Sequence, residues 1–257
     1  IALGINVNSQ FLKIKEFLKK NNLSKTLLLI PKSEFENEIK LALKKQKINF
    51  YKIHSYEINP KTITKEIEEL TLYKERRKDL IRRIKILEKS DDQKDKKEIE
   101  KLKQKDTLGK VSFDSVIVAD FGERLKSVLA SFAFSDVSNK KIKFITLNQW
   151  YNESFFDETF AENLHFPSIG LDNFESFMEI NTKIFNKTPP EISILAYDAI
   201  GLIYYAWNKN NYNVETKYLN IKYGFKGKQG EFIIKNNISY QKLKMYKISE
   251  RKFINVD

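Results

Sequence analysis

Over the first 165 residues, the chain alternates between short apolar segments and longer stretches whose apolar residues recur every three or four positions. The short segments predict buried β-strands, and the longer stretches predict helices with one buried face. The predicted strands cover residues 26–30, 49–56, 114–119, 142–147 and 164–167, and the predicted helices cover 10–20, 34–45 and 123–134. Because strands alternate with helices, we expect an α/β fold with a parallel, doubly wound sheet. Asn8 or Ser9 is the expected cap of the first helix, and Ser33, with Glu36 in a capping box, that of the second.

Residues 62–105 interrupt this alternation with a thin apolar stripe on a heavily charged background. The Ser90-Asp91-Asp92 break predicts two antiparallel helices, a charged helical-hairpin insert at about 62–107 that projects from the domain. Four arginines of the insert are candidates for binding an acidic partner or a phosphate: Arg76, Arg77, Arg82 and Arg83. The alternative is that they form the solvated face of a coiled-coil arm.

The remainder of the chain has a different pattern. Residues 174–185 predict an amphipathic helix, and residues 189–207 have the densest apolar content of the chain, which predicts a helix buried nearly all round. Asp198 lies in this helix and is expected to bond to backbone groups in a structural role. From residue 223 the pattern becomes β-like, with Asn236-Asn237 as a turn. The predicted organisation is an α/β domain over 1–167, helices over 168–218 and a C-terminal β-hairpin segment over 219–257.

Composition narrows the class of protein. The chain has 257 residues, 41% of them hydrophobic and 31% charged, and no apolar run reaches the roughly 18 to 20 residues of a transmembrane helix. The formal net charge is +12, but 40 of the 46 basic residues are lysines scattered over every segment. We therefore interpret the charge as a solvated surface and expect no nucleic-acid partner. A basic α/β nucleic-acid-binding domain is kept as the alternative function.

Sequence motifs give no support to an enzyme. Without cysteine, and with two distant histidines, the chain offers no zinc-ligand spacing, and we expect neither metal nor cofactor. There is no G-x-S-x-G elbow, phosphate-binding loop, G-x-G-x-x-G fingerprint or H-E-x-x-H helix. Asp120-Phe121-Gly122 spells a kinase motif without the accompanying motifs. A non-enzymatic protein is expected.

The order of elements resembles the type I periplasmic ligand-binding proteins, the leucine/isoleucine/valine-binding family. The resemblance rests on the helix ILAYDAIGLI after a proline-rich turn and on the hairpin GFKGKQGEFIIKNN, in which Asn replaces the final glycine of the family pattern. Within that family the chain is most similar to the bacterial penicillin-binding protein activators, through TLGKVSFDSVIVADFGERLKSVLASF, NQWYNESFFDETF and the charged insert.

This resemblance implies a non-enzymatic binding module in the periplasm, lipid-anchored through an N-terminus outside this sequence. One role is an ABC-transporter substrate receptor for a small polar, amino-acid-like ligand. The other is a lipoprotein activator of peptidoglycan synthases, whose partner is a cell-envelope protein such as a penicillin-binding protein. The resemblance also implies that most of a first lobe is missing and that residues 168–218 belong to it. The apolar faces left uncovered would then promote self-association or rearrangement.

Ligands of open α/β sheets bind at the carboxyl ends of the strands. The candidate ligand-binding residues at that edge are Ser33, Phe35, Asp120, Phe121, Gln149 and Trp150. In amino-acid-binding relatives, the resemblance implies a tyrosine, an aromatic residue and a carboxylate in these three loops. Phe35 replaces the tyrosine, and Gln149-Trp150 stands in place of the carboxylate, so amino-acid binding of the usual kind is not expected. The alternative is that the three aromatic residues pack the lobe.

Overall fold

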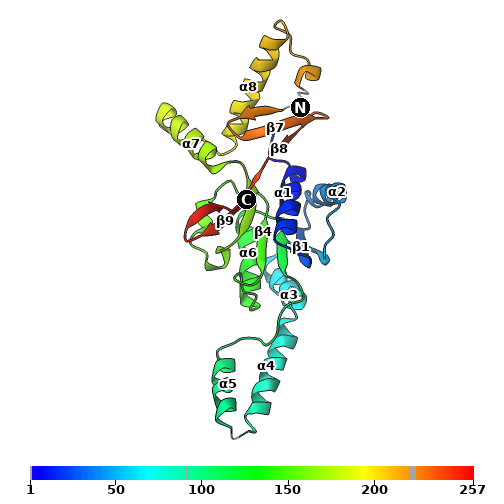
Figure 1. Ribbon diagram of the computed structural model, residues 1–257, viewed down its shortest axis with the longest axis vertical. Helices are drawn as coiled ribbons and strands as arrows, with labels where there is room; N and C mark the ends of the chain where they lie inside the picture. Colours follow the sequence, from blue (N-terminus) through cyan, green and yellow to red (C-terminus); the bar gives the residue numbers. More distant parts are fainter. Residues whose placement is uncertain (1, 91, 220–223) are drawn as a thin grey trace.

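The computed structural model describes residues 2–90, 92–219 and 224–257. Three parts follow one another along the long axis (Figure 1): a helical arm, a central α/β lobe, and a small unit that contains two helices and a three-stranded sheet. The chain starts in the small unit, where Ala2 bridges Ile238. None of the helices in the described ranges is long and apolar enough to cross a bilayer.

The central lobe is built on a seven-stranded sheet with the order β10-β9-β5-β4-β3-β1-β2. Its parallel strands are β1 (Thr26–Pro31), β2 (Lys52–Tyr56), β3 (Ser115–Val118), β4 (Lys143–Thr146) and β5 (His165–Ser168). Two antiparallel strands, β9 (Lys244–Ser249) and β10 (Lys252–Asn255), extend the sheet beyond β5. The predicted parallel α/β sheet is confirmed, with two additional strands at one edge.

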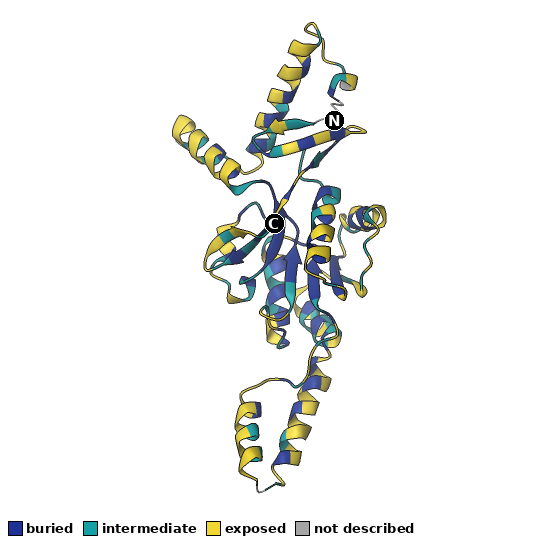
Figure 2. Ribbon diagram, viewed as in Figure 1, coloured by how far each residue is buried: buried dark blue, intermediate teal, exposed yellow. Residues whose placement is uncertain are grey.

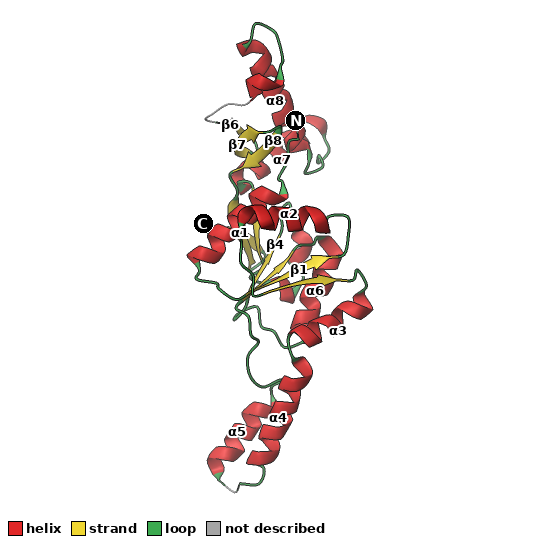
Figure 3. Cartoon of the chain, turned by 90° about the vertical axis from the view of Figure 1, so that its right-hand side faces the viewer, coloured by secondary structure: helices red, strands yellow, loops and turns green. Residues whose placement is uncertain are grey.

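Helices cover both faces of this sheet, as the alternation of segments predicted (Figure 3). On one face, α1 (Val7–Lys20) and α2 (Glu36–Gln46) bury Phe11, Ile14 and Ile39 against Leu28 and Ile30 of β1. On the other face, α3 (Pro60–Leu70) and α6 (Gly122–Phe134) pack against Leu27 and Leu29 of the same strand. Successive β1 residues thus feed two cores, because neighbouring side chains of a strand point to opposite faces.

The expected caps of the first two helices are wrong. The cap of α1 is Asn6, whose side-chain oxygen accepts a hydrogen bond from the Ser9 N–H at 2.9 Å. The helix α2 begins at Glu36, and its N-cap, Phe35, makes no side-chain cap bond. Glu36 instead accepts hydrogen bonds from Lys40 and from the Ser55 hydroxyl on β2.

The charged insert is shorter than predicted. Its first part is α3, whose Ile63 and Ile67 are buried in the lobe, so this helix is a sheet crossover. The arm consists of α4 (Tyr73–Leu87) and α5 (Gln93–Lys103), after a left-handed turn at Leu72. Its two helices meet over Leu80, Leu87 and Leu102, and its outer faces are exposed (Figure 2).

The small unit contains α7 (Leu171–Phe185), α8 (Ser193–Lys209) and the sheet formed by β6 (Phe225–Gly227), β7 (Gly230–Lys235) and β8 (Ile238–Gln241). The segment 219–257, expected as one hairpin, is divided between this sheet and the central one. Short 3-10 helices occur at Glu153–Phe155, Thr159–Ala161 and Thr216–Leu219.

The prediction that α8 is buried nearly all round is wrong. Its buried residues are Ile194, Asp198, Leu202 and Ala206, a single stripe along the helix. Leu202 and Ala206 pack against the small sheet, whereas Ile194 belongs to the core of the central lobe. The opposite face is open to solvent (Figure 2), with Ile200 70% exposed and Tyr204 62% exposed. Apolar density alone does not distinguish a helix covered on all sides from one covered along a single stripe.

Candidate functional site

The candidate site lies at the carboxyl edge of the central sheet, where the loops after β1, β3 and β4 carry the six residues predicted from the sequence. Two of these loops are in contact: the Gln149 side-chain amide donates to the Asp120 carbonyl oxygen at 3.1 Å. The Gly122 N–H, in turn, donates to the Gln149 Oε1 at 3.4 Å. Ser33 and Phe35 lie on the loop after the adjacent strand β1.

Asp120 is fully buried, and the protein uses both of its carboxylate oxygens. The Tyr56 hydroxyl donates to Oδ2 at 2.5 Å, and the Arg124 guanidinium donates to Oδ1 at 3.0 Å. The Phe121 N–H also donates to Oδ1, at 2.8 Å. Burial and the charge of Asp120 raise the pKa of Tyr56, so the phenol stays protonated and remains a donor. Three donors of the protein thus hold this fully buried carboxylate in place.

Gln149 and Trp150 also have internal roles. The amide group of Gln149 donates to the carbonyl oxygens of Asp120 and Leu147, which ties the loop after β4 to the loop after β3. Trp150 adopts a left-handed backbone conformation with φ 50°, and its half-buried ring lies 6.4 Å from that of Phe174 on α7. Trp150 therefore packs between the lobe and α7. This agrees with the alternative that the aromatic residues of these loops pack the lobe and do not bind a ligand.

Three candidate residues have side-chain groups that are exposed or lack a hydrogen-bond partner among the described residues. The rings of Phe35 and Phe121 are 54% and 42% exposed, so these two do not fill the core. The Ser33 hydroxyl is buried and has no hydrogen-bond partner among the described residues. These three residues offer two aromatic surfaces and one hydroxyl, whereas Asp120, the one carboxylate among the six candidates, is already bonded within the protein.

Sequence reasoning missed two residues of this edge, Tyr56 and Arg124. The position of Arg124, four residues after Asp120, is a recognisable signal for an ion pair at the start of α6, and the two groups are 2.8 Å apart. Tyr56 gives no such signal, because it ends β2, 64 residues before Asp120. Both line a small pocket of about 150 Å³ beside Ile63 of α3.

The four-arginine patch predicted on the insert is not formed. Arg76 is only 8% exposed and joins the arm to the lobe: its guanidinium donates to the Thr107 hydroxyl at 2.6 Å and to the Ser135 carbonyl oxygen at 3.2 Å. Arg82 pairs with Asp79 at 2.8 Å, and Arg83 pairs with Glu98 across the hairpin at 2.9 Å. Arg77 is exposed. No group of three or more metal-ligating side chains occurs in the part of the chain that the structure describes.

No family model and no curated protein matches the sequence. The fold matches solved structures. A branched-chain amino acid ABC transporter periplasmic ligand-binding protein from Burkholderia xenovorans gives a TM-score of 0.67 at 8% identity over 99% of this chain and 64% of that one. The LpoA C-domain from Haemophilus influenzae, a regulator of PBP1A, gives 0.61 at 9% identity over 99% of this chain and 68% of that domain. The leucine-binding protein LivK from Thermotoga maritima gives 0.59 at 9% identity over 97% and 65%.

The chain therefore has the fold of the type I periplasmic ligand-binding proteins, and the resemblance inferred from the sequence is confirmed at the level of the fold. It spans 63 to 65% of the length of the transporter-type proteins that it matches. These neighbours are binding proteins and a regulator, and they give the nucleic-acid alternative no support.

Proposed function

We propose that this chain is a non-enzymatic binding module of the bacterial periplasm that acts on a protein partner, and that the partner is a peptidoglycan synthase of the penicillin-binding class. The observation that carries the proposal is the arm, because a hairpin that projects from the lobe offers a protein a surface that solute capture does not need. One structural neighbour, the LpoA C-domain, is itself a regulator of PBP1A.

The two exposed flanks of α4, on either side of its buried stripe, have the chemistry of a protein-binding surface. Ile81 and Ile86 are 47% and 56% exposed, and each follows an arginine by one helical turn, Arg77 and Arg82 respectively. Apolar residues flanked by arginines are typical of the residues that dominate interface energetics. We therefore place the proposed contact with an acidic, partly apolar surface of the partner on the exposed flanks of α4.

The test is a direct binding measurement between the chain and purified penicillin-binding proteins of the same bacterium by biolayer interferometry. The double variant Ile81→Glu/Ile86→Glu is expected to weaken binding at least tenfold. The matched control is Lys97→Glu on α5, an exposed lysine without an ion pair among the described residues, which should change binding less than twofold. If no synthase binds the wild-type chain, or if both variants bind like wild type, the proposal is wrong.

A second candidate function is the binding of a small ligand at the carboxyl edge, favoured by the exposed rings of Phe35 and Phe121 and the unpartnered hydroxyl of Ser33. A ligand that binds only the folded chain at 100 times its Kd would stabilise it by about 2.7 kcal/mol. A thermal-shift screen of amino acids and aromatic acids tests this function. Phe121→Ala should abolish a genuine shift, whereas Phe134→Ala, which removes another exposed ring at the far end of α6, should preserve it.

A further inference from the structure

A cleft of about 720 Å³ lies where the arm joins the lobe, at the amino ends of the central strands. It is therefore at the opposite end of the sheet from the candidate site. Its walls come from α4, from the connection between α5 and β3, and from the turn between α6 and β4. Four cationic residues line it: Arg76, Lys105, Lys110 and Lys141.

The carboxylates of this cleft are already committed to the protein. Asp114 accepts hydrogen bonds from the backbone N–H groups of Ser24 and Lys25, at 2.9 and 3.0 Å. Asp136 accepts one from the Thr107 hydroxyl at 2.5 Å, and its carboxylate lies 3.9 Å from the Arg76 guanidinium. By contrast, none of the three lysines of the cleft forms an ion pair within the residues that the structure describes. The cleft thus carries an excess of uncompensated positive charge.

Arg76 provides an independent observation. Its two terminal nitrogens donate to Ser135, Thr107 and Asp136, but its Nε has no hydrogen-bond partner among the described residues. Burial lowers the pKa of this guanidinium, and the charge of Asp136 opposes that shift. A buried donor of a charged group without an acceptor is costly, so the protein compensates the positive charge of Arg76 only in part.

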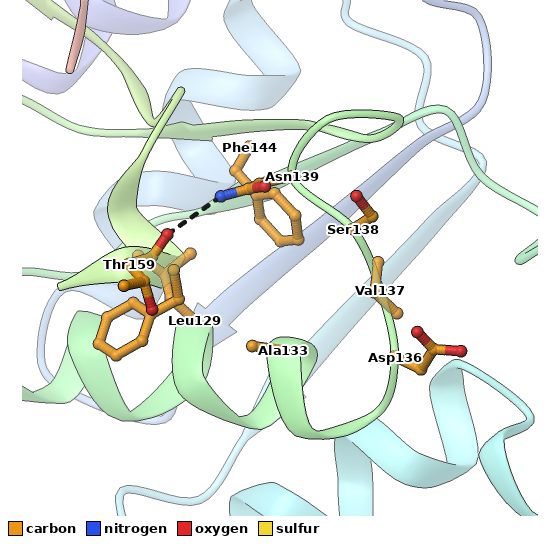
Figure 4. Close-up of a pocket in the computed structure, with 9 residues that line it drawn as sticks. Leu129, Ala133, Asp136, Val137, Ser138, Asn139, Phe144 and Thr159 are labelled. Carbon is orange, nitrogen blue, oxygen red and sulfur yellow. Dashed lines mark hydrogen bonds between the residues drawn. The ribbon is translucent and has the colours of Figure 1, made fainter. Parts of the chain in front are cut away.

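The positive charge is confined to one side of the turn between α6 and β4. A smaller pocket of about 200 Å³ lies there, lined by Leu129, Phe144 and Asn139, which donates to the Thr159 carbonyl oxygen at 3.3 Å (Figure 4). Its lining includes no lysine or arginine. Asp136 lines both this pocket and the cleft (Figure 4). The cationic residues therefore line the cleft at the base of the arm and not the smaller pocket.

We propose that the cleft at the base of the arm binds a phosphate-bearing anion. A phosphoryl group combines negative charge with several acceptor oxygens, which suits three lysine ammonium groups beside the guanidinium of Arg76. The cleft volume falls in the range of ordinary small-molecule sites, and Val111 and Ile142 give it an apolar part that an organic phosphate can contact. Either a soluble phosphate ester or the headgroup of an anionic phospholipid supplies this chemistry.

The test is isothermal titration of the whole chain with inorganic phosphate and with glycerol phosphate at constant ionic strength, with chloride as the reference anion. The variant Lys110→Ser/Lys141→Ser removes two cations of the cleft and leaves the anchor of Arg76 intact. The matched control, Lys101→Ser/Lys140→Ser, removes two exposed lysines that do not line the cleft. We expect saturable binding that the first variant weakens at least tenfold and the control less than twofold.

Co-sedimentation with vesicles distinguishes the two sources of phosphate. Binding to phosphatidylglycerol vesicles but not to phosphatidylcholine vesicles, lost in the cleft variant, supports a phospholipid headgroup. Saturable binding of glycerol phosphate without vesicle binding supports a soluble ester. The proposal is overturned if neither probe binds saturably, or if the cleft variant and the control respond equally. It is independent of the proposed function, since it requires no protein partner.

Discussion

The carboxylate of Asp198 occupies the space in which residue 227 would carry a Cβ, and Gly227 leaves that space open. Only this close approach lets the buried carboxylate of α8 accept hydrogen bonds from the backbone N–H groups of Lys228 and Gln229, at 2.7 and 2.9 Å. The structural role expected for Asp198 is thus confirmed. Its partners lie in the turn between β6 and β7, so one carboxylate joins the helix to the small sheet.

We therefore expect Gly227→Ala to destabilise the chain by about 1–3 kcal/mol, because the added Cβ displaces the carboxylate and leaves buried polar groups unpaired. Urea unfolding measures the change in the free energy of unfolding. The matched control is Gly201→Ala on α8, the helix that carries Asp198, where an added Cβ meets no atom within 4 Å. It should be neutral or stabilising by up to about 1 kcal/mol. Equal effects of the two substitutions would contradict this account.

Local pattern was sufficient to predict the parallel strands. All six residues of β1 are buried, and a continuous apolar run of this kind indicates a strand covered on both faces. The local pattern was insufficient to predict the position of β9 in the sheet. Apolar and polar residues alternate in the same way whether a strand pairs with its hairpin neighbour or with β5, some eighty residues earlier. Which strands pair is a long-range property that one segment cannot report.

The same limit applies to the candidate site. The loops were located correctly, because the carboxyl ends of parallel strands share an edge. The partner of Asp120 on β2 could not be predicted, and so its carboxylate was treated as free for a ligand. Arg76 is a different case. It lies on the helical face of Tyr73 and Leu80, which are also buried, and this spacing is a signal for an inward-facing arginine that the sequence analysis did not use.

The arm should unfold independently of the lobe. Its own core consists of Leu80, Leu87 and Leu102 with partly buried neighbours, separate from the cores of the lobe. We expect Leu102→Ala to destabilise the arm by about 2–5 kcal/mol through the cavity that it leaves. Hydrogen exchange followed by mass spectrometry should then show loss of protection in α4 and α5 only. Ile86→Ala, at a position 56% exposed, is the control that should preserve it.

The exposed face of α8 should promote self-association, as the sequence led us to expect. Large exposed apolar patches on soluble proteins mark interaction surfaces or aggregation liabilities. We expect light scattering coupled to size exclusion to show a concentration-dependent increase in mass. The variant Ile200→Lys/Tyr204→Lys should then be monomeric, while Leu41→Lys, which changes an equally exposed residue (69%) on α2, should behave like wild type. A wild-type chain that stays monomeric at high concentration would contradict the prediction.

A last prediction concerns His165, which is buried at the start of β5. Burial lowers the pKa of His165 to about 4, whereas an unfolded histidine titrates near ~6.5. Between these values the unfolded chain binds a proton that the folded chain excludes. The free energy of unfolding therefore falls as the pH falls from about 6.5 to 4, by an amount on the order of 3 kcal/mol, with no further loss from this residue below that range.

Urea unfolding from pH 7 to pH 4 tests this prediction in the wild type and in His165→Asn. Asparagine does not titrate, and its amide can replace the Nδ1 contact with the Phe144 carbonyl oxygen, at 3.2 Å in the wild type. The difference between the two stability curves should grow as the pH falls through this window. His54→Asn is the control, because His54 is only partly buried beside Glu66; it should keep the pH dependence due to His165. Parallel curves for the wild type and His165→Asn would show that His165 does not cause the loss of stability at low pH.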